Sequence, residues 1–193
     1  MIIDLLTESE KKLTKLKSFK EGEILFYEND VAHVIGIVLE GELTISSVTF
    51  EGNEIIYNRL TKGRMFANNL IFSSDNKFRG DVKAVSKGKV YLIDKNNLVN
   101  LLMHNERFLN DYLSIQSDFA KSLNSQIKLL SFNNAKERFL YYLFINNNHI
   151  YYKNITTLSQ SLFLTREATS RLISNLVKNK KILKNKHEIK LID

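Results

Sequence analysis

Glycine is confined to the first half of this 193-residue sequence, and proline is absent. All seven glycines lie between Gly22 and Gly88, and Gly41, Gly52 and Gly63 follow one another at intervals of eleven residues. Strand-like apolar runs fill the segments between them. Short strands at this spacing, separated by turn glycines, predict a β-sandwich or barrel. The N-terminal half is therefore expected to be a β-domain.

The strands of this domain are expected in short apolar runs, at residues 36–40, 42–50, 54–60, 82–84 and 89–93. Gly22 is expected to open the first pair of strands, and residues 51–53 are expected to turn a hairpin. The last two runs would close the structure.

A long helical stretch is expected at residues 96–132, because apolar residues recur there every three or four positions. Two stripes result. The first stripe consists of Phe108, Tyr112, Ile115, Phe119, Ser122 and Gln126, and the second of Leu109, Leu113, Gln116, Ala120, Leu123, Ile127 and Leu130. One stripe is enough to pack on a β-domain, so the remaining apolar face predicts a partner helix. The alternative is a monomeric helix that is buried on both sides.

Residues 155–183 predict two short helices joined by a tight turn. Thr156 or Thr157 can cap the first helix, which is expected to end at Ser161 or Leu162. Thr165 is a good N-cap for the second helix, which is expected to run to about residue 179.

The second of these helices has an apolar face and a polar face. Its core-facing residues are expected to be Ala168, Leu172, Ile173 and Leu176, and its outward residues Arg166, Glu167, Ser170 and Arg171. Arginine can donate two hydrogen bonds to guanine, glutamate can accept one from cytosine, and serine can contact a base or a phosphate. The alternative is a solvated helix face on which Glu167 and Arg171 form a surface ion pair.

The chain after this helix favours nucleic-acid binding. Residues 182–184 and 188–192 predict two strands around a turn at 185–187, which would form a small wing. Residues 1–134 hold 17 basic and 17 acidic side chains, whereas residues 135–193 hold 11 and 4, so the net charge of +7 lies in the last segment. A basic domain beside a neutral one is expected for binding to the phosphate backbone, with contributions from Lys178, Lys180, Lys181, Lys184 and Lys186. A solvated lysine face is the alternative.

These features resemble the cyclic-AMP receptor protein and fumarate-nitrate regulator (CRP/FNR) superfamily of bacterial transcription factors. The resemblance is carried by FKEGEILFYEND, VLEGELTI and EGNEIIYNRLTKGRMF in the first half, and by residues 135–138, 158–162, 165–167 and 170–172 in the second. It implies an α+β fold with a β-roll of the cyclic-nucleotide-binding, jelly-roll type (1–95), a long dimerisation helix (96–132) and a C-terminal winged helix-turn-helix (133–193). The family's turn glycine falls at Phe163, and the glycine after the recognition helix falls at Lys180.

The resemblance also implies partners and contact residues. Base contacts are expected from the outward residues of the second helix, and the full set of expected DNA-binding residues is Thr165, Arg166, Glu167, Thr169, Ser170, Arg171, Lys184 and Lys186. The expected dimer interface consists of Phe108, Tyr112, Ile115, Phe119, Leu123 and Gln126. Expected partners are double-stranded DNA with an inverted repeat and a second copy of the chain, with RNA polymerase as a further candidate. The alternative function is a β-roll that binds a small ligand and whose helical tail contacts proteins but not DNA.

The ligand segment of the β-roll departs from the family pattern of Phe-Gly-Glu and a later arginine, in which the acid holds the ribose and the arginine pairs with the cyclic phosphate. Here Ala67 and Asn68 replace the glycine and the acid, and Phe78 fills the arginine position. Arg79 is one residue away and would point to the opposite face of a strand. The candidate ligand residues are therefore Ala67, Asn68, Asn69, Phe78 and Arg79, with no cofactor identified. A cyclic nucleotide is disfavoured, which leaves another small ligand or partner, or no ligand.

An enzyme is not expected. The chain has no cysteine, which excludes disulfides and cysteine-ligated metal centres within it. The histidines are isolated in the sequence, at His33, His104, His149 and His187, so no metal site of the kind found in β-roll dioxygenases is predicted. No secretion signal or membrane-length apolar run is recognised, and the protein is expected to be cytoplasmic.

Overall fold

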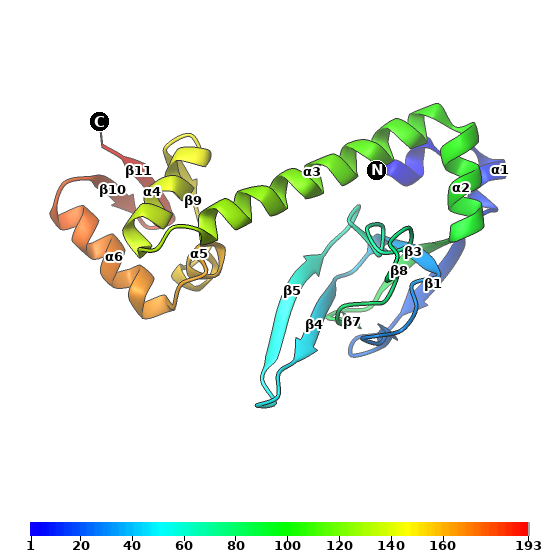
Figure 1. The fold of residues 1–193 in the computed structure, drawn as a ribbon, viewed down its shortest axis with the longest axis horizontal. Coiled ribbons are helices and arrows are strands. Elements are labelled where there is room, and N and C mark those ends of the chain that lie inside the picture. Colours follow the sequence, from blue (N-terminus) through cyan, green and yellow to red (C-terminus); the bar gives the residue numbers. More distant parts are fainter. Residues whose placement is uncertain (193) are drawn as a thin grey trace. The chain divides into compact units, whose positions relative to one another are not determined.

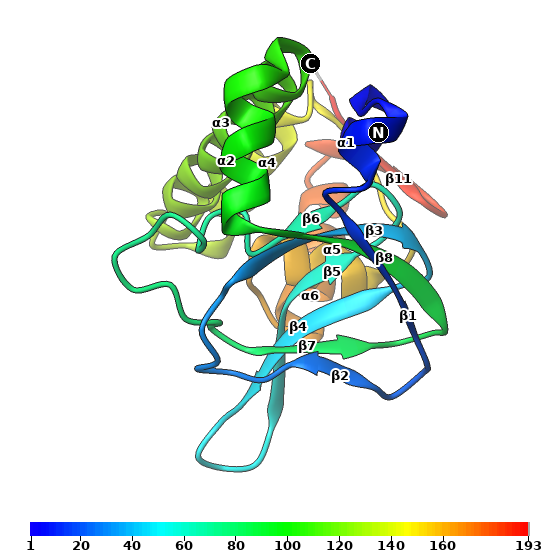
Figure 2. The same cartoon turned by 90° about the vertical axis from the view of Figure 1, so that its right-hand side faces the viewer.

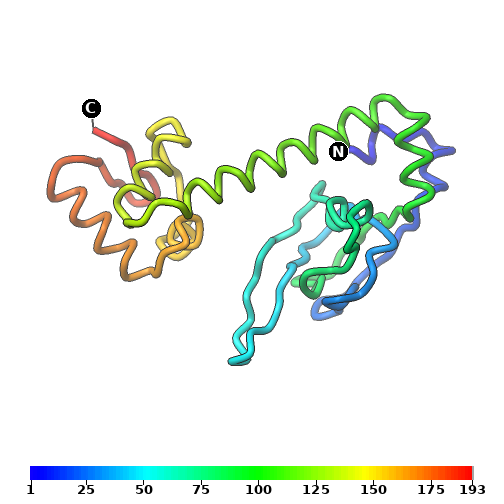
Figure 3. Tube along the Cα trace, in the orientation of Figure 1, coloured from blue at the N-terminus to red at the C-terminus, as the bar shows by residue number. Residues whose placement is uncertain are grey.

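The computed structural model describes residues 1–192, which form two compact units that divide between Asp118 and Phe119. We refer to them as the N-terminal and C-terminal units. Figure 1 shows the elements of each, and Figure 3 traces the path of the chain. The long helix α3 (Glu106–Leu130) begins in the first unit and ends in the second.

The N-terminal unit contains two four-stranded antiparallel sheets, as its glycine spacing predicted. The first sheet has the order β1 (Lys15–Phe19), β8 (Gly88–Asp94), β3 (Val34–Glu40) and β6 (Met65–Phe66). The second has the order β2 (Ile24–Phe26), β7 (Asp81–Ala84), β4 (Leu43–Val48) and β5 (Glu54–Leu60). Together they form the expected antiparallel jelly roll of a mixed fold with helices, and Figure 2 shows their strands crossing.

Strand β3 lies between the two hydrophobic cores of the N-terminal unit. Its residues alternate between two cores, because successive side chains of a strand point to opposite faces. Val38 joins the core inside the roll, whereas Ile35 and Ile37 join a second core outside it. A Cβ atom at Gly36 would overlap the ring of Phe66, so the pairing of β3 with β6 requires glycine there.

Helices cover this outer core. They are the 3-10 helix η1 (Ile2–Leu5), α2 (Lys95–His104) and the first half of α3, whereas the short helix α1 (Glu8–Lys11) has no buried residue. The stretch at 96–132, which was expected to be one long helix, contains two helices, α2 and α3. Asn105 separates them because its backbone is extended. Its side chain accepts a hydrogen bond from the Phe108 amide at 2.9 Å and donates to the Leu5 carbonyl at 3.2 Å, which compensates for the break.

The two stripes of α3 have different environments. Phe108 and Tyr112 of the first stripe are buried in the outer core of their own unit, and Ile115 packs against it. Phe108 and Tyr112 are therefore not available to a dimer interface, whereas Phe119, Leu123 and Gln126 of the expected interface are exposed. The second stripe has more exposed large apolar residues than the first, and these are Leu113, Leu123, Ile127 and Leu130.

The C-terminal unit combines the end of α3 and three further helices with a three-stranded antiparallel sheet. The helices are α4 (Ala135–Ile145), α5 (Ile155–Leu162) and α6 (Arg166–Lys178), and the sheet has the order β10 (Ile182–Asn185), β11 (Glu188–Leu191) and β9 (His149–Tyr151). Its core is formed by Phe139, Leu143, Ile150, Leu158, Leu162, Ile173, Leu176, Ile182 and Ile189. Strand β9 was not predicted, because three residues are too few to show an alternating pattern.

The starts of α5 and α6 follow from side-chain capping. Asn154, and neither of the threonines expected, caps α5, and its side chain accepts a hydrogen bond from the Thr157 amide at 2.9 Å. Thr165 caps α6 as predicted, accepting from the Ala168 amide at 3.1 Å. Among the described residues, no helix combines the length and mean hydropathy that crossing a membrane requires.

Candidate nucleic-acid interface

Helix α6 presents a polar face to solvent because its apolar residues are anchored in the unit's core. Ile173 and Leu176 are buried, and Ala168 and Leu172 are partly buried beside them. The exposed residues at the start of the helix are Arg166, Glu167, Ser170 and Arg171, with the cap Thr165 also exposed.

Thr169 does not belong to this face. Its side chain is fully buried, and its hydroxyl donates to the Thr165 carbonyl at 3.0 Å. The expectation that it contacts DNA is wrong, because a residue four positions after the cap lies on the core side of the helix here.

Both turns around α6 adopt the geometry that glycine usually supplies. Phe163 has φ 52° and ψ 44°, and Lys180 has φ 55°. The left-handed conformation allows the Leu164 amide to donate to the Ser159 carbonyl at 3.0 Å and the Lys181 amide to donate to the Leu176 carbonyl at 2.9 Å. Each non-glycine residue in this region costs about 1 to 2 kcal/mol, so the fold tolerates the strain and keeps the turns.

Strands β10 and β11 form a hairpin with a two-residue turn, since Asn185 pairs with Glu188. Lys184 and Lys186 are exposed on it. Glu188 joins the hairpin to β9: its Oε1 lies 2.8 Å from Lys190 Nζ and 2.6 Å from His149 Nε2. Contacts with Lys190, Asn185 and His149 lower the pKa of Glu188 to about 2.

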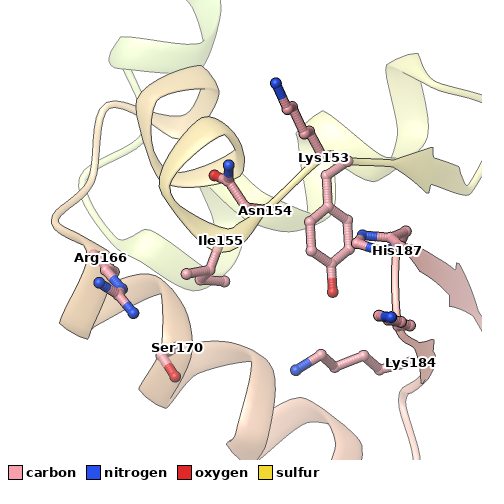
Figure 4. Close-up of a pocket in the computed structure, with 9 residues that line it drawn as sticks. Lys153, Asn154, Ile155, Arg166, Ser170, Lys184 and His187 are labelled. Atoms are coloured by element: carbon pink, nitrogen blue, oxygen red, sulfur yellow. The ribbon is translucent and has the colours of Figure 1, made fainter.

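A groove of about 310 Å³ lies between α6, the hairpin and the start of α5 (Figure 4). We call it the basic groove, and it is lined by Tyr152, Lys153, Asn154, Ile155, Arg166, Ser170, Lys184, Lys186 and His187. Figure 4 shows the Lys184 side chain extended toward Ser170. Its lining includes four cationic residues, Lys153, Arg166, Lys184 and Lys186, and such a concentration of positive charge suits phosphate groups.

The basic groove unites some of the predicted DNA-binding residues and adds others. Arg166, Ser170, Lys184 and Lys186 line it together. Glu167 and Arg171 are exposed on α6 outside its lining. The sequence interpretation missed Tyr152, Lys153, Asn154, Ile155 and His187. The available signal was the Lys-Asn pair directly before α5, because amides at a helix N-terminus attract anions.

The candidate ligand residues of the β-roll do not share one environment. Phe78 is buried and stacks on Phe26 with ring centroids 4.9 Å apart, whereas Arg79 is exposed and pairs with Asp75 at 2.7 Å. Ala67 is buried with φ 59°, and Asn69 is exposed. The position of the expected phosphate arginine is thus filled by an aromatic side chain of the core.

Asn68 is engaged by α3. Its backbone carbonyl accepts hydrogen bonds from the Tyr112 hydroxyl at 2.9 Å and from Gln116 Nε2 at 3.0 Å, and its side-chain amide donates to Gln116 Oε1. Burial raises the pKa of Tyr112 to about 12, so this hydroxyl stays protonated and donates. Within residues 1–192, no three His, Cys, Asp or Glu side chains are grouped so that they could hold a metal ion.

The chain is similar to one known protein family and to several solved structures. The family described as Cyclic nucleotide-binding domain matches residues 16–105. A transcriptional regulator from Thermotoga maritima is 24% identical, with 65% of this chain and 98% of that chain covered and a TM-score of 0.60. The catabolite activator protein of Thermus thermophilus is 15% identical, with coverages of 99% and 93% and a TM-score of 0.60. A CooA variant from Carboxydothermus hydrogenoformans is 18% identical, with coverages of 100% and 91% and a TM-score of 0.70.

No curated protein sequence matches the chain. Residues 16–105 nevertheless match the cyclic nucleotide-binding domain family, and the chain has the same fold as the catabolite activator protein and CooA structures.

Proposed function

We propose that the chain is a homodimeric transcription regulator that binds inverted-repeat DNA through a winged helix-turn-helix and does not require cyclic AMP. The observation that carries this proposal is the basic groove, which sets Arg166 and Ser170 of α6 beside Lys184 and Lys186 of the hairpin. In this proposal α5 and α6 are the helix-turn-helix, and β10 and β11 are the wing. The names of two similar structures, a transcriptional regulator and a catabolite activator protein, support the same class of function.

Helix α6 is the proposed base reader. Its 13 residues span about 20 Å at a rise of about 1.5 Å each, so its exposed first turns can enter a major groove about 12 Å wide. Arg166 and Arg171 would donate to guanine, and Glu167 would accept from cytosine. The lysines of the wing, with Lys153 from the segment before α5, would contact phosphates and hold the helix in register.

The second stripe of α3 is the proposed dimer interface. It repeats at alternating spacings of four and three from Leu109 to Leu130, which is the heptad pattern of a coiled coil. Leu123, Ile127 and Leu130 are exposed on a 25-residue helix, where a second copy of the same stripe would cover them. This interface replaces the one that included Phe108 and Tyr112.

Independence from cyclic AMP is supported by three positions in the β-roll. Phe78 fills the place of the phosphate arginine and stacks on Phe26 in the core. Arg79, the nearest cation in the sequence, is exposed and paired with Asp75. The side chain of Asn68 is bonded to Gln116 and carries no charge. A cyclic phosphate brought into this interior would lose its hydration without gaining a cation, which is unfavourable.

The test is selection from a pool of duplexes with a randomised central segment, at two salt concentrations and without added nucleotide. We expect enrichment of an inverted repeat whose half-sites lie about 34 Å apart, one helical turn, because a two-fold axis would relate the two reading helices. A pool that is not enriched over the input would overturn DNA recognition. Enrichment of a single, asymmetric half-site would overturn the dimer while leaving DNA recognition in place.

A further inference from the structure

Arg138 of α4 contacts three backbone carbonyls in two different parts of the C-terminal unit. Its Nη1 donates to the Leu162 carbonyl at 3.4 Å and to the Phe163 carbonyl at 3.2 Å, and its Nη2 donates to the Phe132 carbonyl at 3.0 Å. Leu162 ends α5, and Phe163 is its left-handed cap. Phe132 follows the end of α3.

The first pair of contacts lies at the strained turn. The last carbonyls of a helix have no partner within the helix, and they form its negative end. A guanidinium here therefore makes charge-assisted hydrogen bonds with groups that would otherwise need water. These bonds form when Phe163 has its positive φ, so they offset the strain of a turn that lacks glycine.

The third contact lies at the junction of α3 and α4. The ring of Phe132 packs on Tyr141 with centroids 5.0 Å apart, and Lys128 Nζ lies 5.0 Å from the Tyr141 ring centre. Leu129 is buried in the same region. The end of α3 is thus packed on α4, and the guanidinium of Arg138 donates both to the Phe132 carbonyl just after α3 and to the α5–α6 turn.

Only arginine fits this arrangement. Its planar fork can reach carbonyls on two sides at once, whereas a lysine ammonium acts as a single point charge. The Nε of Arg138 is buried and has no hydrogen-bond partner within residues 1–192. The side chain therefore adopts this position although one of its donors is unsatisfied. Its role therefore depends on geometry as well as on charge.

We infer that Arg138 is a positioning residue that fixes the turn before α6 relative to the end of α3, and so sets how the base-reading face is presented. This inference rests on the proposed function, because it assigns Arg138 to DNA recognition without contact with DNA. Arg138 does not line the basic groove. It therefore acts through the turn and not through a phosphate contact.

The first experiment does not depend on DNA. Hydrogen exchange of the Leu164 amide, which bonds to the Ser159 carbonyl across the turn, is measured in the full chain. Arg138→Lys should raise the local opening of this amide by about tenfold, because charge-assisted hydrogen bonds are lost while the charge is kept. Adding Phe163→Gly should restore protection, because glycine adopts a positive φ without strain. Lys136→Met, at an exposed cation on the same helix, should change nothing.

The second experiment uses the duplex selected by the unmodified protein and versions with one base pair inserted or removed between the half-sites. Arg138→Lys should weaken the preference for the original spacing and leave binding to a scrambled duplex unchanged. Unchanged exchange of Leu164 would overturn the turn contact, and unchanged spacing preference would show a structural role only and overturn the positioning inference. If the unmodified protein selects no DNA, the proposed function fails, while the exchange experiment still decides the turn contact.

Discussion

Replacing Ile127 by aspartate should convert the proposed dimer to monomer. The single chain leaves Leu113, Leu123, Ile127 and Leu130 exposed at 51%, 42%, 65% and 48%. These exposed fractions add up to about two fully exposed side chains per copy, so pairing two copies would bury the equivalent of about four. At about 1.5 to 3 kcal/mol for each buried side chain, this burial would contribute roughly 6 to 12 kcal/mol to the free energy of association. Association itself costs an estimated 4 kcal/mol or more, so the net affinity depends on every member of the stripe.

Ile127 is the most exposed of the four residues and therefore gains most from pairing. Aspartate there removes roughly 2 to 4 kcal/mol of burial, counting both copies, and places two unpaired charges in a dry interface at several kcal/mol more. The dimer should weaken by at least about a hundredfold, since 1.4 kcal/mol corresponds to a factor of ten. Folding of the single chain should be unaffected, because the side chain makes little contact within it.

Sedimentation velocity at micromolar concentration measures this change directly. Asn124→Asp, which introduces the same charge at an exposed position of α3 outside the stripe, serves as the control and should remain dimeric. Urea unfolding should give similar midpoints for the two variants once dimerisation is taken into account. An unmodified protein that is already monomeric, or an Ile127→Asp variant that stays dimeric, would refute the assignment of the stripe.

Three further outcomes are expected. Arg171→Ala should cost about 1 to 3 kcal/mol per half-site on the selected duplex and little on a scrambled one, whereas Lys184→Ala should weaken both alike and reduce the salt slope by about one; filter binding at several salt concentrations separates them, and equal losses for Arg171→Ala would contradict base reading. Titration calorimetry should detect no micromolar binding of cyclic AMP, and added nucleotide should leave DNA affinity unchanged; tight binding would identify Arg79 as a displaced phosphate contact. Glu188 has a pKa of about 2 in the folded chain against an ordinary value of 4.5, so its stabilising contribution is present above pH 4.5 and is lost as the pH falls toward 2. The difference in urea midpoint between the unmodified chain and Glu188→Gln should shrink across that range, and a constant difference would argue against the ion pair.

Local patterns were sufficient for most elements. The eleven-residue glycine spacing and the alternating runs placed β3, β4, β5, β7 and β8 in a roll, because turn glycines and period-two patterning are local requirements. Thr165 and the three-and-four spacing after it placed α6 for the same reason. The N-cap of α5 was misplaced by two or three residues, since Asn154 and the threonines after it can all accept an amide hydrogen bond.

Which apolar face is buried depended on partners distant in sequence. The two stripes of α3 are similar in composition, and only the folded roll shows that Phe108 and Tyr112 pack on it while Ile127 stays exposed. Asn105 breaks the helix because Leu5 and Glu10, about a hundred positions earlier, accept its amide hydrogens.

The candidate site likewise has some features that follow from the sequence and others that depend on the fold. The sequence by itself determined that α6 carries an exposed Arg-Glu-Ser-Arg face and that the basic excess lies in the last third of the chain. Only the tertiary structure removed Thr169 from that face and brought Lys153 to the same groove as Lys184. Side-chain type and periodicity are properties of a local segment, whereas burial and the convergence of charges depend on which segments meet in the fold.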